Sequence, residues 1–564
     1  PNLAQQLKTL LSFCHRGALG RSQAMARTSM CLIALCGCIA IASAFSPSLS
    51  MPPRAFSLHK PCSAASSPHR AALCPPTRRA ALRMSTLENV DTSVEEAIKG
   101  PKFDFKKQWY PLAVPAFIDP KKPQAAQLLG HDLVIWRDTV EGKWHVFEDA
   151  CPHRLAPLSE GRVEEDGTLL CAYHAWRFDS SGKCTSMPHA MEGTEKKLTS
   201  APPSCAVSYP TQEAQGLLWV WGSPGAPGSD AALEAALKEP SVIPELDDPA
   251  LEGRVNQYHW NIRDMPYGWD YFTENVLDPA HVAVSHHGLV GSRYDGQPIS
   301  YEQTRALTTE GGFALGIKVG SEEKVAEQDK KGLMPEMEFV PPARVIQRNR
   351  FPHGGQMILA LYSAPTKPGW VRHIGCNIIV KGEDGKVPDG LAFFSIRMPV
   401  WLSHITAALF LHMDMVFLHH QEKILASKGY KNEKGGKGDY LSLVHVPTQQ
   451  DLGVNMFRKW LQNSCDGGVP WPEGCEELPP RERNNDKLFD VYDTHTANCA
   501  ICKTALKNFK TARFVLFAAA FAVAAFFKGV TALVGGGLLA IAGLLLGKII
   551  NMFYHYPFDH AYND

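Results

Sequence analysis

The chain has 564 residues, 45% of them hydrophobic, which is enough for two or three domains with separate apolar cores. Its 57 Lys and Arg residues balance 57 Asp and Glu residues, and this formal net charge of zero argues against a general nucleic-acid-binding protein. Six of the fifteen cysteines lie before residue 85, and four of the other nine fall in two short motifs. Such usage indicates metal and redox chemistry more than a disulfide framework.

The segment 1–84 has the composition of a targeting sequence. No Asp or Glu precedes Glu88, while Arg, Ser, Pro and Ala are abundant. We predict a signal peptide that starts at Met25 and contains the apolar run 31–42, followed by an Arg-rich transit peptide, with an upstream extension before Met25. The "ASAF" junction resembles the bipartite presequences of algae whose plastids came from a eukaryotic endosymbiont. The resemblance implies a plastid, and together with the apolar C-terminal segments we expect a plastid membrane, envelope or thylakoid, with soluble domains facing the stroma.

Two domains follow the presequence, and together they predict an α+β fold. Between residues 109 and 221, short alternating runs such as "LVIWRD" and "GLLWVWG" predict an antiparallel β domain, which we place at 103–225. A linker rich in Gly, Pro and Ser follows. In the second domain, 226–490, strand and helix patterns mix, and "ALFLHMDMVFLHHQEKIL" has the apolar spacing of a helix.

The C-terminal part predicts a membrane hairpin. After a CxxC segment at 491–510, the apolar runs 514–527 and 530–546 indicate two spans within 511–550. Arg513 and Lys548 flank the pair, which favours both ends on one side of a membrane. The alternative is a hairpin buried in a soluble protein.

Four residues of the first domain have the spacing of metal ligands. Cys151-x-His153 and Cys171-x2-His174 lie in two loops, and each loop supplies one Cys and one His. Zinc could bind this set, but in a zinc finger the cysteines pair with each other and so do the histidines. One Cys and one His from each loop suit a [2Fe–2S] cluster with thiolates on one iron and imidazoles on the other.

The second domain contains the stretch "ENVLDPAHVAVSHHG" (274–288), which offers up to three imidazoles. Two imidazoles and a carboxylate on one face of Fe(II) leave positions open for O₂. Helical periodicity does not choose between His286 and His287, because they lie about 140° and about 120° from His281 in opposite directions.

This stretch offers too few ligands for a complete metal site, and the downstream candidates for a carboxylate ligand are Asp414, Asp439 and Asp451. Asp414 lies mid-helix among apolar residues, so its charge needs a strong partner unless it lies on a solvated face of that helix. Asp278, followed by Pro279, has the alternative role of capping a helix.

A third motif precedes the apolar runs: Cys499-x2-Cys502 in "HTANCAICKTALK". As a dithiol, this pair is a candidate redox group. Zinc would need His495 and one more ligand from elsewhere in the chain.

The Cys-His loops resemble the Rieske domain, and Asn275-x2-Asp278-x2-His281-x4-His286 resembles the iron motif of Rieske non-haem oxygenases. One departure is Ala175 in "CAYHAWRF", where that family usually has Gly; it matters if the backbone there needs a positive φ. The resemblance implies a [2Fe–2S] cluster, mononuclear Fe(II) and O₂ as cosubstrate.

The same resemblance implies roles for single residues. It favours His286 over His287 as iron ligand, and Asp414, with Gln421 a few residues later, as the carboxylate. It implies that Asp278 bridges a cluster histidine and an iron histidine across a subunit boundary of a head-to-tail homotrimer. Asp278 and Asn275 are therefore counted as catalytic residues.

Four further features are similar to the pheophorbide a oxygenase group of plastid Rieske enzymes, which includes the inner-envelope translocon-associated Rieske protein. They are "MPYGWDYFTENVLDPAHVAVSHHGL", "FRKWL", "VPWPEG" and the CxxC ahead of paired apolar segments. No strand-anchored G-x-G-x-x-G occurs outside the apolar tail, so the expected electron donor is ferredoxin with its reductase, and thioredoxin is a candidate partner of the CxxC.

The reaction implied by this group is the oxygenolytic opening of pheophorbide a in chlorophyll breakdown. One alternative is a methyl-group hydroxylase of chlorophyllide, protochlorophyllide or a linear tetrapyrrole. The other is a non-catalytic, redox-sensing electron-transfer component of an envelope complex.

Overall fold

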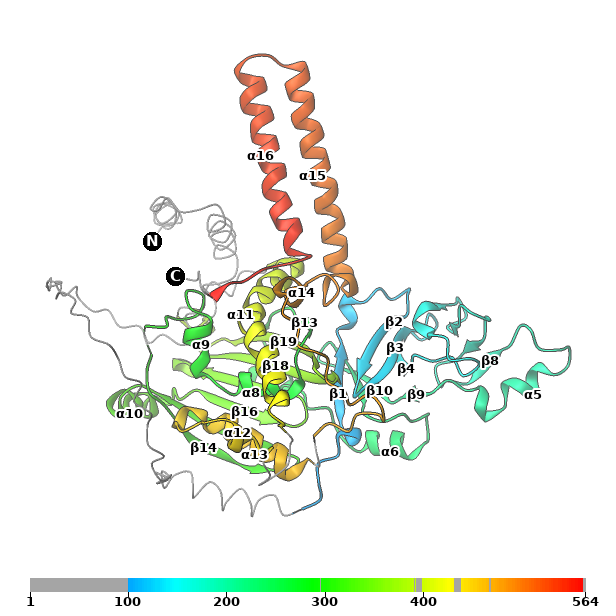
Figure 1. Ribbon diagram of the computed structural model, residues 1–564, viewed down its shortest axis with the longest axis horizontal. Coiled ribbons are helices and arrows are strands. Elements are labelled where there is room, and N and C mark those ends of the chain that lie inside the picture. Colours follow the sequence, from blue (N-terminus) through cyan, green and yellow to red (C-terminus); the bar gives the residue numbers. More distant parts are fainter. Residues whose placement is uncertain are drawn as a thin grey trace, which may run out of the picture.

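The computed structural model of the chain describes residues 100–294, 296–389, 391, 398–430, 438–465 and 468–560. The predicted presequence lies outside these residues. Figure 1 shows a body with a large sheet, a β-rich lobe at one end of it, and a helical hairpin that projects away from both.

The β-rich lobe contains three small antiparallel sheets, with strand orders β1-β11-β10, β2-β3-β4-β9 and β5-β6-β7-β8. Strand β3 is buried at four successive residues because Leu133 and Ile135 pack into one apolar core and Val134 and Trp136 pack into another, so that both faces of the strand are covered. The predicted antiparallel β domain is confirmed. The bounds are β1 Trp109–Ala113, β2 Gln124–Leu128, β3 His131–Arg137, β4 Trp144–Glu148, β5 Arg162–Val163, β6 Leu169–Leu170, β7 Arg177–Phe178, β8 Cys184–Ser186, β9 Ser208–Tyr209, β10 Thr211–Ala214 and β11 Leu217–Trp221, with helices α5 Glu195–Thr199 and α6 Asp230–Ala236.

The second domain is built on an eight-stranded antiparallel sheet of order β12-β19-β18-β17-β16-β15-β14, in which β13 also pairs with β19. Helices α8, α11 and α13 contact this sheet, so the domain is α+β as predicted. The strands are β12 Val255–Gln257, β13 Asn261–Met265, β14 Ile299–Thr308, β15 Gly312–Val319, β16 Glu336–Val340, β17 Arg344–Arg350, β18 Gln356–Lys367 and β19 Trp370–Val380. The helices are α7 Pro244–Asp247, α8 Trp269–Val276, α9 Ala280–Ser285, α10 Glu322–Lys330, α11 Val400–Ser427, α12 Tyr440–Leu443, α13 Leu452–Ser464 and α14 Asn485–Leu488.

Helix α11 runs through the second domain and carries an unusual number of buried polar groups. It is long and apolar enough to cross a membrane, but half of its most apolar window is buried inside the protein. Its buried polar residues are His404, His412, Asp414, His419, Glu422 and Lys423. Since each buried polar group needs a partner, this helix is the natural place to look for functional sites.

The projecting hairpin consists of α15 (Ala500–Phe526) and α16 (Val530–Met552), joined by a turn in which Gly529 has φ 67°. Both helices are long and apolar enough to span a membrane, and only 6% and 22% of their apolar windows are buried. The predicted run 530–546 lies inside α16, and the run 514–527 extends one residue beyond the end of α15. Helix-forming residues such as those of "KTALKNFK" extend α15 toward its N-terminus.

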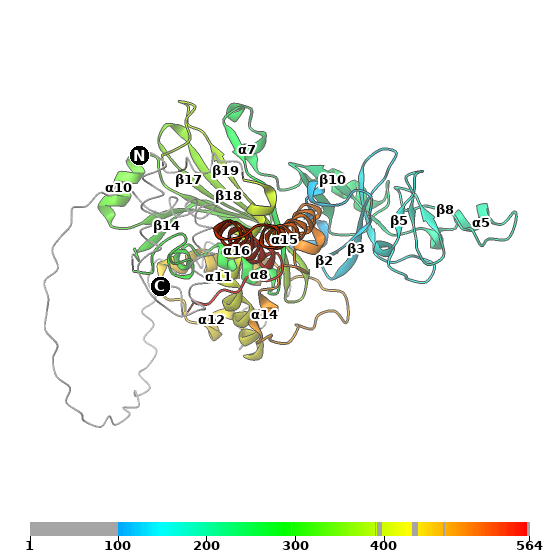
Figure 2. The ribbon, with the colours of Figure 1, turned by 90° about the horizontal axis from the view of Figure 1, so that it is seen from above.

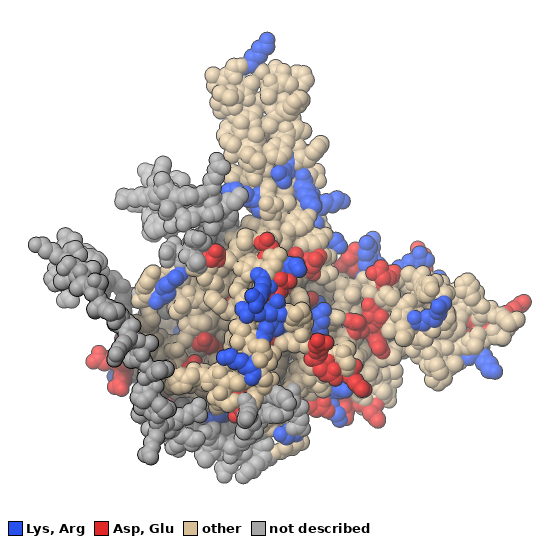
Figure 3. All heavy atoms as spheres, viewed as in Figure 1, with Lys and Arg blue, Asp and Glu red and all other residues tan. Residues whose placement is uncertain are grey.

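Charge is distributed unevenly along the hairpin. Seen from above, α15 and α16 stand over the second domain (Figure 2). Figure 3 shows basic side chains at the base of the hairpin, an uncharged stretch above them and a basic group at the tip. The base contains Lys503, Lys507, Lys510, Arg513 and Lys548. This pattern fits a hairpin whose two ends lie on the same side of a membrane.

Candidate metal centres

The two Cys-His loops of the first domain share one backbone design. The N–H of Leu155 donates to the Cys151 carbonyl (2.8 Å), and the N–H of Ala175 donates to the Cys171 carbonyl (2.9 Å). Both closing residues have positive φ, 58° for Leu155 and 57° for Ala175. A non-glycine residue in the left-handed region costs about 1–2 kcal/mol, so each loop is strained at the same point and held there by a hydrogen bond. The left-handed backbone at Ala175 is therefore matched by another non-glycine residue, Leu155, at the same position of the first loop.

The thiols of these loops point inward and the imidazoles outward. Cys151 and Cys171 are buried, whereas His153 is exposed and His174 is half-buried. The two imidazole rings lie 4.6 Å apart, and Trp176 stacks on His153. Burial and the neighbouring Cys171 thiol raise the pKa of the Cys151 thiol to about 12. Two thiolates side by side here need a cation, so the pairs fit a [2Fe–2S] cluster with thiolates inside and imidazoles outside.

A second group of ligand atoms forms where α9 meets α11. His281 Nε2 lies 3.5 Å and His286 Nε2 lies 3.2 Å from Asp414 Oδ2. His281 belongs to α9, His286 is the residue that ends it, and Asp414 lies in the middle of α11. All three ligand atoms fall within 4.8 Å of one another.

Hydrogen bonds fix the orientation of both rings. Nδ1 of His281 donates to the carbonyl of Asp278, which turns Nε2 toward Asp414. Burial lowers the pKa of this ring, but the Asp414 carboxylate raises it above its ordinary value. Nδ1 of His286 lies 3.3 Å from the Met413 sulfur, and the ring stacks on Phe410 at 3.9 Å. Nε2 of His286 is buried without a hydrogen bond. An unsatisfied buried nitrogen aimed at a carboxylate fits a metal ligand.

The carboxylate of Asp414 has the properties of a charged ligand. Burial alone would raise its pKa, but the imidazoles of His281 and His286 lower it well below its ordinary value. Its other oxygen accepts a hydrogen bond from the hydroxyl of Ser285. Asp414 therefore stays ionised at neutral pH and points one oxygen at the two histidines, as a two-histidine, one-carboxylate iron site requires.

The other candidate ligands have local partners. His287 Nδ1 accepts a hydrogen bond from the Arg293 N–H (3.0 Å). Asp439 caps α12 by accepting from Leu441 N–H, and Asp451 forms a capping box with Thr448. Helical geometry could not choose between His286 and His287 because His286 lies just beyond the last helical residue, Ser285, where the chain has left the helix.

Asp278 lies in the turn between α8 and α9, and Asn275 lies in the last turn of α8. The carboxylate of Asp278 accepts from the Ala280 N–H (2.8 Å), as a capping residue does, and its second oxygen lies 3.8 Å from His281 Nδ1. The carbonyl of Asn275 accepts from the Asp278 N–H (3.1 Å). Asp278 is half-buried, and burial raises its pKa. Its carboxylate thus caps the helix and also lies beside the ring of a candidate iron ligand.

A third cluster was only half anticipated from the sequence. Cys499, Cys502 and His495 are joined by His404 of α11, and their ligand atoms also fall within 4.8 Å of one another. Sequence reasoning missed His404 because it lies 91 residues before His495 with no spacing motif. The available signal was a histidine on a largely apolar helix, which needs a buried partner.

Comparisons with known proteins agree with this arrangement. Residues 108–202 match the family model described as Rieske [2Fe-2S] domain, and residues 339–432 match the one described as Pheophorbide a oxygenase. A pheophorbide a oxygenase from Oryza sativa subsp. japonica is 33% identical over 80% of this chain and 83% of its own length. The protochlorophyllide-dependent translocon component 52 of Arabidopsis thaliana is 30% identical over 74% of this chain and 76% of its own. A flavonoid 8-hydroxylase from Ocimum basilicum is 29% identical over 82% of this chain and 87% of its own. These three relatives carry the word "chloroplastic" in their names.

Proposed function

Because the chain belongs to the pheophorbide a oxygenase family of Rieske enzymes, we propose that it opens the macrocycle of pheophorbide a with O₂ and electrons from ferredoxin. The observation that carries the proposal is the pairing, in one chain, of a Rieske domain with the cluster of His281, His286 and Asp414. An electron carrier needs the first only, whereas an oxygenase needs both.

In this proposal each ligand residue has a defined task. Cys151, His153, Cys171 and His174 hold the [2Fe–2S] cluster, and His281, His286 and Asp414 hold Fe(II). Fe(II) supplies the activation of O₂ when it is bound. Asp278 keeps the tautomer of His281 through its backbone carbonyl, and Ser285 orients Asp414 through its hydroxyl.

We further propose a head-to-tail trimer in which the cluster of one subunit serves the iron of the next. In Figure 1, α9 lies toward one end of the molecule and β8, next to the Cys-His loops, toward the other. Electrons then cross between subunits, and Asp278, half-buried beside His281, is the bridging residue. Asn275 holds the Asp278 backbone in place.

The hairpin supports a membrane location for the enzyme. An apolar tetrapyrrole partitions into a bilayer, so a membrane-attached enzyme meets it at high local concentration. We place the protein at a plastid membrane, envelope or thylakoid, with both domains on the stromal side, where ferredoxin is available. This placement is supported by the chloroplastic relatives and by the Lys and Arg side chains where the hairpin joins the two domains.

The test is a parallel turnover assay. Purified protein, ferredoxin, its reductase, NADPH and O₂ are incubated separately with pheophorbide a, chlorophyllide a and protochlorophyllide. We expect a red product from pheophorbide a that has gained two oxygen atoms and lost the absorption of the closed macrocycle. Unchanged pheophorbide a, with the cluster reduced and reoxidised normally, would contradict the proposal.

A second candidate is hydroxylation without ring opening, which the 29% identical flavonoid 8-hydroxylase favours. In that case a product gains one oxygen atom and keeps its ring system. A flavone added as a fourth substrate covers this possibility. A non-catalytic role as a redox-sensing electron carrier predicts no product from any of the four substrates.

A further inference from the structure

The cluster at the base of the hairpin brings together four buried side chains from three parts of the chain. His404 comes from α11, His495 from the segment before α15, and Cys499 and Cys502 from the start of α15. All four are at most 6% exposed.

The distances among these groups are those of ligands around a single ion. His404 Nδ1 lies 3.0 Å from His495 Nε2, and both lie close to the sulfur of Cys502, at 3.2 and 3.3 Å. The sulfur of Cys499 lies 3.8 Å from His404 Nδ1. Zinc binds nitrogen at about 2.0–2.1 Å and thiolate at about 2.3 Å, so the corners of such a tetrahedron lie about 3.3–3.8 Å apart.

Hydrogen bonds to backbone carbonyls decide which ring nitrogens carry hydrogens. His404 Nε2 lies 3.0 Å from the carbonyl of Trp260, and His495 Nδ1 lies 2.6 Å from that of Ile262. A carbonyl only accepts, so these two nitrogens carry the hydrogens and the other nitrogen of each neutral ring has a bare lone pair. Two bare lone pairs then face each other at 3.0 Å, with the Cys502 thiol next to both of them and the Cys499 thiol next to that of His404.

We propose that His404, His495, Cys499 and Cys502 bind one structural Zn²⁺ ion. A cation between the rings satisfies both lone pairs at once, and two thiolates neutralise its charge within a buried site. Both histidines donate their outer N–H to a carbonyl, which is the usual support of zinc-binding imidazoles. With four protein ligands the coordination is closed, as in structural and not in catalytic zinc sites.

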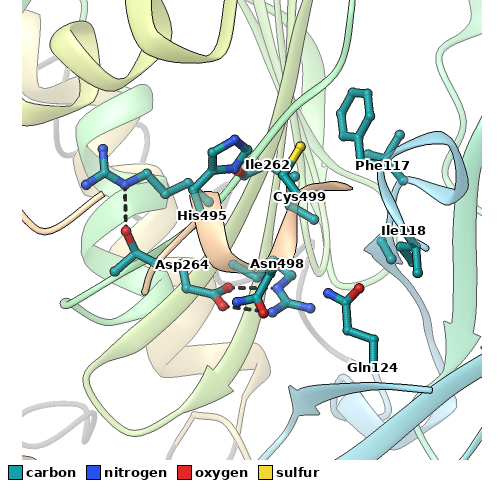
Figure 4. A pocket seen from close by; sticks show the side chains of 13 residues that line it. Phe117, Ile118, Gln124, Ile262, Asp264, His495, Asn498 and Cys499 are labelled. Carbon is teal, nitrogen blue, oxygen red and sulfur yellow. Dashed lines mark hydrogen bonds and ion pairs between the residues drawn. The ribbon is translucent and has the colours of Figure 1, made fainter. Parts of the chain in front are cut away.

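This site joins the hairpin to the rest of the protein. Besides linking α15 to α11, His404 packs edge-on against Phe117 of the first domain at 4.7 Å. Figure 4 shows His495 and Cys499 on the wall of a small cavity of about 30 Å³, with Ile118 and Gln124 of the first domain opposite. Zinc would therefore fix the base of the hairpin where both domains meet.

The proposal competes with the redox role predicted for the CxxC. A dithiol that exchanges with thioredoxin must reach solvent, but Cys499 and Cys502 are each 1% exposed. A zinc-bound pair resists alkylation until the metal is removed, a disulfide resists it until a reductant is added, and a free dithiol reacts once the protein unfolds.

The first experiment measures metals in the full-length protein, purified without added zinc and without chelator. We expect about one zinc per chain besides iron. Alkylation in denaturant, followed by mass spectrometry of the peptide with Cys499 and Cys502, is expected to label both thiols without reductant, and under native conditions only after a zinc chelator is added. Wild-type protein that lacks zinc and also fails to take up Zn²⁺ or Co²⁺ would overturn the proposal, as would an unlabelled pair that only a reductant releases.

The second experiment uses matched variants. We expect His404→Gln and Cys502→Ser to lower the zinc content at least fivefold while the iron content and the Rieske spectrum persist. His412→Gln, on the same helix and equally buried, and Cys376→Ser, another buried cysteine, serve as controls and are expected to keep zinc. Equal zinc in the cluster variants and the controls would refute the site. If the variants fail to fold, the metal and alkylation measurements on wild-type protein still decide.

Discussion

At the scale of single residues, the adjacent histidines His286 and His287 provide a sharp test of the iron site. The Nε2 of His286 is buried without a hydrogen bond and faces Asp414, whereas His287 accepts a hydrogen bond from Arg293. We expect His286→Ala to lose the mononuclear iron and at least about 100-fold in turnover, because losing even a supporting partner of a ligand costs up to that factor. His287→Ala is expected to keep both within twofold.

The measurement is iron content together with the Rieske absorption spectrum and substrate turnover. His286→Ala should fall from three irons per chain to two with an unchanged cluster spectrum. If His287→Ala loses the iron instead, the ligand assignment is wrong.

Residue types and spacing predicted much of the site, and the remainder depends on tertiary contacts. The Cys-His loops and His281 follow from local motifs, because their ligands lie within a few residues of one another. Asp414 and His404 are separated from their partners by more than 90 residues, so only the packing of α11 brings them together. Periodicity could not separate His286 from His287, because the helix ends at Ser285, and only the family resemblance favoured His286.

At the scale of elements, a buried arginine ties α8 to α13. Arg458 of α13 makes ion pairs with Glu274 and Asp270 of α8, including a 2.6 Å hydrogen bond to each, and its guanidinium lies over the rings of Tyr271 and Tyr440. Since α8 leads through a short turn into α9, which carries His281, this network holds the site in position.

We expect Arg458→Met to lower the free energy of unfolding by about 3–5 kcal/mol, because it leaves the carboxylate of Glu274 buried without its counter-ion. Thermal melting followed by circular dichroism measures the effect. Lys331→Met, which removes an exposed pair with Glu327, is the control and is expected to cost less than about 1 kcal/mol. Equal effects of the two substitutions would contradict a stabilising role for the network.

The hairpin gives a second prediction at this scale. Leu538 of α16 is 63% exposed on the uncharged part of the hairpin, where a bilayer would cover it. A Lys near the centre of a span costs about 2.5–3.5 kcal/mol, so Leu538→Lys is expected to shift the protein from the membrane to the soluble fraction. Leu237→Lys, at an 89% exposed position at the end of α6, should have no effect in the same liposome flotation assay.

The hairpin also shows what hydropathy alone could not predict, namely where its helices begin and end. Hydropathy located the apolar runs, but α15 begins at Ala500, well before the first of them, because its basic first half is helical as well. The same hydropathy measure would count α11 as a span, and only its burial against the sheet shows that it belongs to the second domain.

At the scale of the whole molecule, the trimer proposal predicts complementation between inactive variants. Cys171→Ser removes the cluster and His281→Ala removes the mononuclear iron, so each is expected to be inactive alone. If electrons cross between neighbouring subunits, co-expression in equal amounts restores about a quarter of the wild-type activity, since one interface in four pairs an intact cluster with an intact iron site.

Size-exclusion chromatography with light scattering provides the subunit count for the same samples. Mixed oligomers without activity would indicate transfer within one chain. Co-expression of either variant with itself is the control and should stay inactive.

The spacing of contacts along α11 limits which insertions and deletions this helix can accept. The helix is fastened at His404, through the carbonyl of Trp260, and again at Asp414, through Ser285, ten residues later. Each helical residue adds about 1.5 Å and turns the chain by about 100°, so one inserted or deleted residue between these points would swing one of them away from its partners. Even a seven-residue insertion, which nearly restores the direction, would displace it by about 10 Å. A change in the number of residues between these two points would therefore misalign the hairpin and the iron site.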